Sequence, residues 1–459
     1  MSVTRPSATN NRPDRDMETV NFTSIRMLEI EISRPLPYVS AYDEQKGHTY
    51  RRALSLVRLH TQPLGLIELH LDADGLTPLD YARQIWCALG SQITAHLRED
   101  GLPAVTALQE CGIATTDTPR CVQHRERFLA HAPLVSVIIP TSNRTDRLAV
   151  CLDSLLASRY PNFEIIVVDS IPKTSATADL LRDAYGALPQ VRYIREDRPG
   201  SSAARNRGLT IAKGEIVAFT DDDVVVDAYW LAEMAKGFRA ADNVGCVTGL
   251  IIPMELETQA QVWFEQYGGF SKGVARQIYD LGRHRPSDPL FPYNAGMFGS
   301  GNSMAFNRTV LRKVGNFDPM LGNNTPALGG VDIDAFFRIV INGYQLVYEP
   351  AAIVHHAHRR DYAGLRKQVY SFAAGTTAFQ MKSILAHPRL LPGFIAIVPA
   401  GLRFILSPQS DLNKQKRRDY PEELTVLDRK GMLYGPLAYL RSWWWWHVSL
   451  PLNRRWRVK

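Results

Sequence analysis

The chain has few cysteines and no long hydrophobic run among its first residues. Its 459 residues contain five cysteines, an odd and scattered set. Such a set is typical of reduced thiols and a cytoplasmic location, not of a disulfide-stabilised secreted protein. The opening residues MSVTRPSATNNRPDRDMETVN hold no apolar core of signal-peptide length, so they do not indicate secretion. Residues 1–20 are polar, and we expect them to form a disordered tail.

The sequence lacks the motifs of a zinc site, of a nucleotidyltransferase or dinucleotide-binding loop, and of a nucleic-acid-binding domain. Cys111, Cys121 and His124 have a loose metal-ligand spacing, but no second Cys/His pair lies nearby in the sequence, which disfavours zinc. The segment PTSNRTDR after the first buried apolar run lacks the glycines of a nucleotidyltransferase loop and of a dinucleotide-binding G-x-G-x-x-G. No nucleic-acid-binding motif accompanies the basic residues, so we expect no nucleic-acid partner.

The composition is that of an ordinary folded protein with a basic excess. Hydrophobic residues make up 45% and charged residues 22%, and the formal net charge is +7. A basic excess suits anionic partners such as nucleotides or an acidic membrane surface. The length allows two or three domains.

Residues 25–131 are predicted to form a small α/β module of unknown role. ALSLVRLHTQPLGLIELHLD reads as two strands joined at TQPLG. TPLDYARQIWCALGSQITAHLRED then repeats apolar residues at helical spacing, and Thr77 is placed to cap this helix.

Residues 133–380 alternate short apolar runs with helical patterns. Val135 to Ile139 form a continuous β-branched run, which is typical of a parallel strand buried on both faces. FEIIVVDS, VRYIRED and EIVAFTDDD are further strands, and PGSSAARNRGLTIAKG is a helix with a Gly/Ser-rich start. This alternation predicts a mostly parallel, Rossmann-like sheet flanked by helices. Ligands bind such sheets at the carboxyl ends of the strands, which are polar here.

Those strand ends carry residues suited to a nucleotide and a cation. Asp169 can accept hydrogen bonds from a base or ribose. Ser201, Ser202 and the first N–H groups of the next helix form an anion site, to which Arg205 adds a charge. Asp221 and Asp223 alternate on what we expect to be extended backbone, so they share a face, while Asp222 points the opposite way. Two carboxylates beside a diphosphate suit Mg²⁺ or Mn²⁺.

The ordered motifs resemble family 2 glycosyltransferases, which have the GT-A fold. The resemblance covers roughly residues 133–380 and is carried by VSVIIPTSNR, EIIVVDS, RPGSSAARNRG, FTDDDVVVDAYW, GSGNSMAFNRTVLRKVGNFDPMLG and GGVDIDAFFRIVINGYQLVYEPAAIVHHAH. It implies a nucleotide-sugar donor and a divalent cation, Mg²⁺ or Mn²⁺, as cofactor.

The resemblance also implies a role for each site residue. The nucleotide-sugar would contact Pro140, Thr141, Asn143, Asp169, Ser201, Arg205, Asp221 and Asp222. Asp223 and His356 would hold the metal, and Asp332 would be the catalytic base. A base opposite the leaving group gives a single displacement and hence inversion at the anomeric carbon.

Several of these residues have an alternative reading. Asp332 stands where a helix N-cap would also stand, and Asp334 is typical of a helical salt bridge. Many members of the family carry an acidic residue directly before the base, where this chain has Val331; its absence removes a supporting charge. Alternation places His356 and His358 on one face of an extended segment and His355 on the other.

Residues 381–459 are predicted to form a helical, basic and aromatic extension. LLPGFIAIVPAGLRFILSP is too short before Arg403 to span a bilayer as one helix. The run SWWWWHV, flanked by arginines, suits a membrane interface or packing on the catalytic domain. We therefore expect a cytoplasmic protein that is either soluble or peripherally attached to the inner face of the cell membrane.

The predicted function is a metal-dependent inverting glycosyltransferase. It would move a sugar from a nucleotide-sugar to a hydroxyl of a glycan, a lipid-linked acceptor or a small molecule. The alternative is a catalytically silent protein that binds a nucleotide-sugar or acts as a scaffold, and Val331 favours it slightly.

Overall fold

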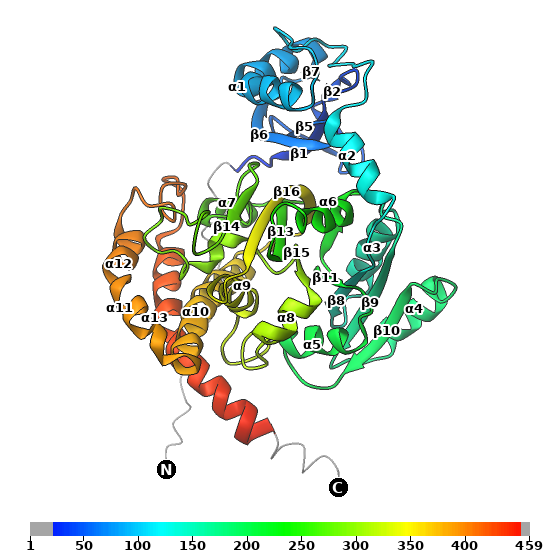
Figure 1. Cartoon of the computed structure of the whole chain (residues 1–459). Helices are drawn as coiled ribbons and strands as arrows, with labels where there is room; N and C mark the ends of the chain where they lie inside the picture. Colours follow the sequence, from blue (N-terminus) through cyan, green and yellow to red (C-terminus); the bar gives the residue numbers. More distant parts are fainter. Residues whose placement is uncertain (1–21, 451–459) are drawn as a thin grey trace, which may run out of the picture.

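The computed structural model describes residues 22–450. The tail predicted for residues 1–20 lies outside this range. Figure 1 shows a small N-terminal unit beside a larger unit built on one long sheet, with the C-terminal helices against its side.

The N-terminal unit is built on a three-stranded sheet with a long helix against it. The sheet has the order β1 (Arg26–Glu31), β5 (Arg52–Leu59), β6 (Gln62–His70). Two small ladders add β2 (Val39–Ser40), β3 (Tyr42–Asp43), β4 (His48–Thr49) and β7 (Gly75–Leu76). Helix α1 (Pro78–Glu99) follows, and the Thr77 side chain caps it by accepting from the Asp80 N–H, as predicted. Helix α2 (Arg120–Leu129) leads into the larger unit.

The two strands predicted for this unit, β5 and β6, are confirmed, but the turn between them includes only the first residue of TQPLG, because β6 already begins at Gln62. The chain reverses at His60 and Thr61, whose φ angles are 55° and 70°. Pro63 lies inside β6, where it is tolerated because β6 is an edge strand. Gly65 also belongs to the strand: a Cβ there would come within 2.5 Å of Leu89 on α1. The Pro and Gly therefore serve an edge strand and a close helix contact, not a turn.

The larger unit contains one mixed sheet of nine strands. The order is β10-β9-β8-β11-β15-β13-β16-β12, with β14 also paired to β16. Strands β10, β9, β8 and β11 are parallel, and so are β13 and β16, whereas β15, β12 and β14 run antiparallel to their neighbours. The bounds are β8 Val135–Thr141, β9 Phe163–Ser170, β10 Val191–Glu196, β11 Ile216–Phe219, β12 Val224–Val226, β13 Val244–Pro253, β14 Gln277–Tyr279, β15 Met304–Asn307 and β16 Gln345–His356. The predicted mostly parallel α/β sheet is confirmed.

Helices cover both faces of this sheet. They are α3 (Thr145–Leu156), α4 (Ala176–Tyr185), α5 (Ser201–Ile211), α6 (Trp230–Gly237), α8 (Arg308–Val314) and α9 (Val331–Ile341). Helix α7 (Gln259–Tyr267) packs on α10 (Tyr362–Ala386), which in turn packs on α9. Alternation along β8 divides the core: Val137 packs in one cluster with Leu148 of α3, and Ile138 packs in the other with Ala204 of α5. A strand buried on both faces needs the unbroken apolar run that the sequence has.

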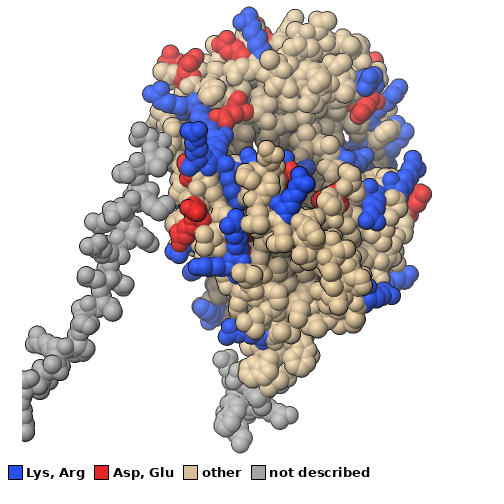
Figure 2. Space-filling model, turned by 90° about the vertical axis from the view of Figure 1, so that its left-hand side faces the viewer, with Lys and Arg blue, Asp and Glu red and all other residues tan. Residues whose placement is uncertain are grey.

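The C-terminal helices are α11 (Leu391–Ala396), α12 (Val398–Leu406) and α13 (Glu422–Trp444), and the predicted boundary near residue 380 falls inside α10. Of these helices, α13 packs along α10, Phe394 of α11 packs on Tyr293 and Phe337, and apolar side chains on all three helices stay exposed. Gly431 and Gly435 of α13 lie so near the α10 backbone that a Cβ would clash, which explains the close packing of the two helices. Figure 2 shows the face that carries α11 and α12, with Lys and Arg beside a broad area without charged side chains.

None of the helices within residues 22–450 is by itself both long and apolar enough to cross a membrane. The bent pair Pro388–Ala396 and Val398–Leu406, which meet at 49°, meets that criterion only when the two are taken together.

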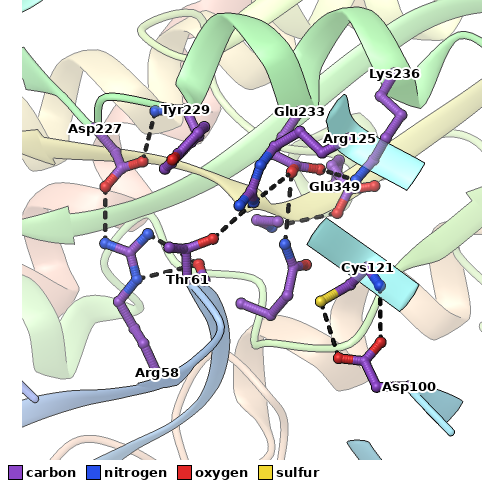
Figure 3. Close-up of polar contacts among 12 residues, drawn as sticks. Arg58, Thr61, Asp100, Cys121, Arg125, Asp227, Tyr229, Glu233, Lys236 and Glu349 are labelled. Atoms are coloured by element: carbon purple, nitrogen blue, oxygen red, sulfur yellow. Dashed lines mark hydrogen bonds and ion pairs between the residues drawn. The ribbon is translucent and has the colours of Figure 1, made fainter. Parts of the chain in front are cut away.

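Buried ion pairs join the N-terminal unit to the larger one (Figure 3). Arg58 of β5 donates to Asp227 at 2.7 Å, and Arg125 of α2 lies 3.3 Å from Glu233 of α6. Glu233 is almost fully buried and also pairs with Lys236. Removing one partner of such a pair strands a buried charge at a cost of about 3–5 kcal/mol. The contacts therefore specify how the two units sit together.

Candidate nucleotide and metal site

The predicted site residues Pro140, Thr141, Asp169 and Asp221 to Asp223 lie at the carboxyl ends of β8, β9 and β11, and the others come from the loop after β8, α5, α9 and the end of β16. The parallel register pairs Thr141 at the end of β8 with Asp169 near the end of β9. The three aspartates Asp221 to Asp223 follow β11 and form a turn before β12. The expectation of extended backbone there was wrong, because the chain must reverse between a strand parallel to β8 and a strand antiparallel to β16.

The turn still separates the carboxylates as predicted. Asp221, Asp223 and His356 each offer one ligand atom, and these atoms lie within 4.8 Å of one another. The antiparallel pairing of β12 with β16 sets Val224 opposite His356. His356 Nε2 is therefore 3.4 Å from Asp223 Oδ1 although the two residues are far apart in the chain. Two carboxylate oxygens and one imidazole nitrogen fit a divalent cation such as Mn²⁺ or Mg²⁺.

The electrostatics of this cluster favour an ionised Asp223. Burial opposes its ionisation, but the hydrogen bond and charge of His356 and the charge of Arg144 outweigh burial and lower the pKa of Asp223 to about 2. Burial raises the pKa of Asp221, and the negative charges of Asp223 and Asp332 raise it further against the effect of Arg205. Asp332 thus lies near enough to act electrostatically on the cluster.

Asp222 points away from the cluster. Its carboxylate accepts a hydrogen bond from Thr141 Oγ1 at 2.7 Å and one from Arg144 at 3.1 Å. Asp222 and Thr141 therefore brace the end of β8 against the turn.

Asp169 is fully buried at the end of β9. Its Oδ2 accepts from the Tyr193 hydroxyl at 3.2 Å, whereas its Oδ1 has no partner among the residues that the structure describes. Burial raises the pKa of this carboxyl group. An unsatisfied buried acceptor costs about 1–3 kcal/mol. A ligand N–H or O–H at this position would satisfy it.

The loop after β8 reaches the loop after β9. Pro140 pairs in register with Val168. Asn143 has a φ angle of 52°, and its side-chain oxygen accepts from the Lys173 N–H at 3.2 Å. Pro140, Thr141 and Asn143 thus lie along the same sheet edge as Asp169.

The start of α5 packs close to the aspartate turn. Gly200 has a φ angle of 102°, and the helix begins at Ser201. Ser202 donates to the Leu321 carbonyl and is buried, so its hydroxyl has a structural role. Arg205 donates to Asp221 at 3.3 Å, and its Nε is buried without a partner in the described part of the chain. Arg205 therefore reaches the carboxylate cluster from the helix predicted to bind phosphate.

Asp332 lies in the first turn of α9 and does not cap it. Gly330, with a φ angle of 87°, holds the N-cap position, and the helix begins at Val331. Asp332 Oδ2 accepts from the Gly301 N–H at 2.7 Å. The N-cap alternative is thus wrong. Val331 points into the core, where its side chain would contact any Cβ on Gly322. This packing explains an apolar residue at 331.

The neighbouring charged residues are arranged as the sequence predicted. Asp334 is buried between Arg338 at 2.9 Å and Lys382 at 2.7 Å. His358 lies 3.3 Å from His356 and 2.8 Å from Glu265, on the cluster side. His355 faces the N-terminal unit and contacts Glu29 at 2.5 Å.

Sequence reasoning missed two arginines and one lysine. Arg144, the N-cap residue of α3, and Arg147 in its first turn lie 3.3 and 3.4 Å from Asp223 Oδ2, with side chains about half exposed. Two basic residues near the helix start after the first strand were the available signal, and nothing in the local sequence distinguishes them from solvated helix charges. Lys272, whose pKa burial lowers, interacts with Asp332 and Glu265.

Part of this site lies in a segment that matches a known protein family. Residues 136–315 match the family model described as Glycosyl transferase family 2. The match includes Asp169, Arg205 and the aspartate turn and ends before Asp332 and His356.

Two curated proteins and one solved structure illustrate the likeness. An uncharacterized protein of Sinorhizobium fredii is 39% identical over 118 residues, 25% of this chain and 13% of the relative. The pre-mycofactocin glycosyltransferase of Mycobacterium tuberculosis is 29% identical over 248 residues, 53% of this chain and 47% of the relative. The chain thus spans about half or less of the curated relatives it matches. A mannosyltransferase of Pyrobaculum calidifontis, solved with GDP-Man and Mn²⁺, is 20% identical, with a TM-score of 0.43 over 70% of this chain and 91% of that one.

Proposed function

Residues 136–315 belong to glycosyl transferase family 2, and on this premise we propose that the protein is a metal-dependent inverting glycosyltransferase. It transfers a sugar from a nucleotide-sugar to a hydroxyl group of a glycan, lipid-linked or small-molecule acceptor. The observation that carries the proposal is the meeting of Asp221, Asp223 and His356 within 4.8 Å at the edge of the sheet that also holds Asp169.

The donor is bound from two sides in this mechanism. The unpaired Asp169 Oδ1 accepts a hydrogen bond from the base, and the loop from Pro140 to Asn143 lines the base and ribose. Asp221 faces the ribose or sugar. The α5 N-terminus and Arg205 lie on the diphosphate side, where helix N–H groups favour an anion.

The cation would be held by Asp223 and His356, with Asp221 beside them. When bound, it supplies Lewis-acid stabilisation of the departing nucleoside diphosphate. Arg144 and Arg147 neutralise Asp223 in the structure. Because both side chains are about half exposed, they are free to turn toward the diphosphate and add charge-assisted contacts.

Asp332 takes the proton of the acceptor hydroxyl. Its Oδ2 is fixed by the Gly301 N–H, which orients the carboxylate. A base on the side opposite the leaving group gives one displacement, so the product has the inverted anomeric configuration.

A thermal-shift screen tests the donor half of the proposal. The purified chain is titrated with nucleoside diphosphates and nucleotide-sugars, with and without Mn²⁺. One nucleotide is expected to raise the midpoint of unfolding in a Mn²⁺-dependent way, since binding to the native state alone stabilises it. The absence of a shift with every nucleotide would contradict the proposal.

A nucleotide-sugar-binding protein without catalysis is the second candidate. The pairing of Asp223 with Arg144 and Arg147 favours it, because these arginines compete with a cation for the same carboxylate. The two candidates differ in turnover: this one predicts Mn²⁺-dependent nucleotide binding with neither transfer nor donor hydrolysis across an acceptor panel.

We also propose that the C-terminal helices attach the protein to the inner, cytoplasmic face of the membrane. Exposed apolar residues recur at helical spacing along α11 and α12, at Leu391, Ile395, Val398, Leu402 and Leu406. A second stripe on α13 consists of Leu433, Leu437, Leu440, Trp443 and Trp444. Stripes of this kind, with indoles and neighbouring arginines, suit the interface of an anionic bilayer.

Vesicle co-sedimentation checks this attachment. The wild type is expected to sediment with phosphatidylserine-containing vesicles and much less with neutral ones. The double variant Leu433→Glu, Leu437→Glu places charges on the 83% and 53% exposed positions and is expected to stay in the supernatant. Leu79→Glu, on an exposed position of α1, is the matched control and is expected to bind like the wild type. Equal sedimentation of the α13 double variant would refute this role for the α13 stripe.

A further inference from the structure

A second group of metal-ligating side chains lies in the N-terminal unit, away from the catalytic site. His60 comes from the β5–β6 turn, His96 and the capping residue Asp100 come from the end of α1, and Cys121 comes from the start of α2. One ligand atom from each of the four lies within 4.8 Å of the others. Asp100 and Cys121 are drawn in Figure 3.

The atoms converge on one point. His60 Nδ1 and His96 Nε2 are 3.1 Å apart, and each is 3.1 Å from Asp100 Oδ2. Cys121 Sγ is 2.9 Å from the same oxygen. Zinc in a tetrahedral site has ligand distances of about 2.0–2.3 Å, which places its ligand atoms about 3.3–3.8 Å apart. The three distances of 3.1 Å among His60, His96 and Asp100 reach that range with shifts of a few tenths of an ångström, and Cys121 Sγ must move somewhat further from Asp100 Oδ2.

Hydrogen bonds alone satisfy this arrangement poorly. If both imidazoles and the thiol donate to Asp100 Oδ2, three protons crowd one oxygen, and two N–H groups face each other across 3.1 Å. If one imidazole instead carries its proton on the ring nitrogen outside the cluster, the lone pair of its other nitrogen faces a lone pair of Asp100 Oδ2. A single cation at the centre removes the conflict, because each of the four atoms then presents a lone pair to it.

We propose that His60, His96, Asp100 and Cys121 bind a structural divalent transition-metal ion, for which Zn²⁺ is the best match. Two imidazoles, one carboxylate and one thiolate form a closed set of the ligand types that Zn²⁺ prefers. The set differs from the catalytic cluster, whose two carboxylates and one histidine suit a harder cation. The sequence near Cys121 contains no second Cys/His pair of metal ligands, and in the structure His60 and His96 supply the two further ligands.

The surroundings hold the ligands in place. Asp100 Oδ1 accepts from the Cys121 N–H at 2.8 Å, so this carboxylate tethers the start of α2 while its other oxygen faces the cluster. Glu31 accepts from the N–H groups of His60 and Thr61 at 3.0 and 2.8 Å and braces their strained turn. Supporting contacts of this kind orient metal ligands. His60 Nε2 is buried without a partner in residues 22–450, so the cluster side alone holds the ring by polar contacts.

A metal here would fasten three separate elements. It joins the β5–β6 turn, the end of α1 and the start of α2, and α2 carries Arg125 into its buried pair with Glu233 of the catalytic unit. Metal binding at such a site contributes directly to folding. The site therefore serves the stability of the N-terminal unit and its seating on the catalytic unit.

Metal analysis of the full chain tests the proposal. Protein purified from zinc-supplemented cells and dialysed against metal-free buffer is expected to hold about one zinc per chain. Cys121→Ser and His96→Gln are expected to retain less than about one-tenth of that amount. Cys111→Ser and His124→Gln, matched changes in the same unit outside the cluster, are expected to retain it. Asp223→Asn is expected to retain it too, because it alters only the catalytic cluster.

Replacement of zinc by Co²⁺ in the wild-type protein tests the same site without any variant, so the result does not depend on whether the variants fold. Wild-type protein reconstituted with Co²⁺ is expected to show a thiolate-to-cobalt charge-transfer band, which requires a sulfur ligand. Absence of the band, together with no bound zinc, would overturn the proposal. Zinc lost by Asp223→Asn but kept by Cys121→Ser would also overturn it, because the ion would then belong to the catalytic cluster.

Discussion

Substituting Asn for Asp332 is expected to lower the rate of sugar transfer by about 10³-fold, within the range typical of a lost general base. Asn is nearly the same size and keeps an oxygen that can accept from the Gly301 N–H, so the start of α9 is expected to stay in place. The amide cannot take a proton from the acceptor hydroxyl. Nucleotide binding is expected to stay within about twofold of the wild type, since Asp169 and the aspartate turn are unchanged.

The measurement pairs a transfer assay with nucleotide titration of the same protein. Asp361→Asn is the matched control: Asp361 accepts from the Gly364 N–H at the start of α10, and the change from carboxylate to amide is the same. The control is expected to transfer at the wild-type rate. Turnover of Asp332→Asn within about tenfold of the wild type would move the role of base to another group.

The sequence predicted the residues of the site that follow the parallel strands, because apolar runs identify those strands and the topology of a parallel sheet brings their carboxyl ends together. The apolar run from Val135 to Ile139 needs burial on both faces, and the polar residues after it and after β9 and β11 therefore meet at one edge. Asp169, Arg205 and the aspartate turn were found in this way. The roles of Asp332 and His356 came from the family resemblance, because no local sequence pattern predicts that their segments lie beside the aspartate turn.

The features that the sequence did not predict depend on contacts between distant segments. The pairing of β12 with β16, which sets His356 beside Asp223, is antiparallel and involves only three residues of β12. Arg144 and Arg147 look like solvated helix charges until the turn brings Asp223 to them. His60 and Cys121 likewise meet only because the turn after β5 lies at His60 and Thr61, where neither residue is a glycine.

Asp223→Asn is expected to weaken Mn²⁺ binding in the presence of a nucleoside diphosphate by more than about 100-fold. Loss of a supporting contact to a metal ligand costs about 10–100-fold, and loss of a charged ligand should cost more. Asp223 is the member of the cluster kept ionised, with its pKa lowered to about 2, so it supplies a full negative charge to a cation. The fold is expected to survive, because Arg144 and Arg147 are half exposed and water can replace their partner.

The titration of Mn²⁺ against the nucleotide-dependent thermal shift decides this prediction. Glu215→Gln is the matched control, since Glu215 is exposed just before β11, at the end opposite the aspartate turn, and its change is expected to have no effect on the titration. Asp222→Asn distinguishes an effect on the metal cluster from a general effect on the aspartate turn. Asp222 contacts Thr141 and Arg144, so the Mn²⁺ dependence is expected to remain in this variant. If Asp222→Asn removed the dependence and Asp223→Asn did not, the metal would be held by the other face of the turn. Unchanged Mn²⁺ dependence in both variants would mean that the cation needs neither carboxylate, and the metal-dependent mechanism would fail while nucleotide binding through Asp169 could still stand.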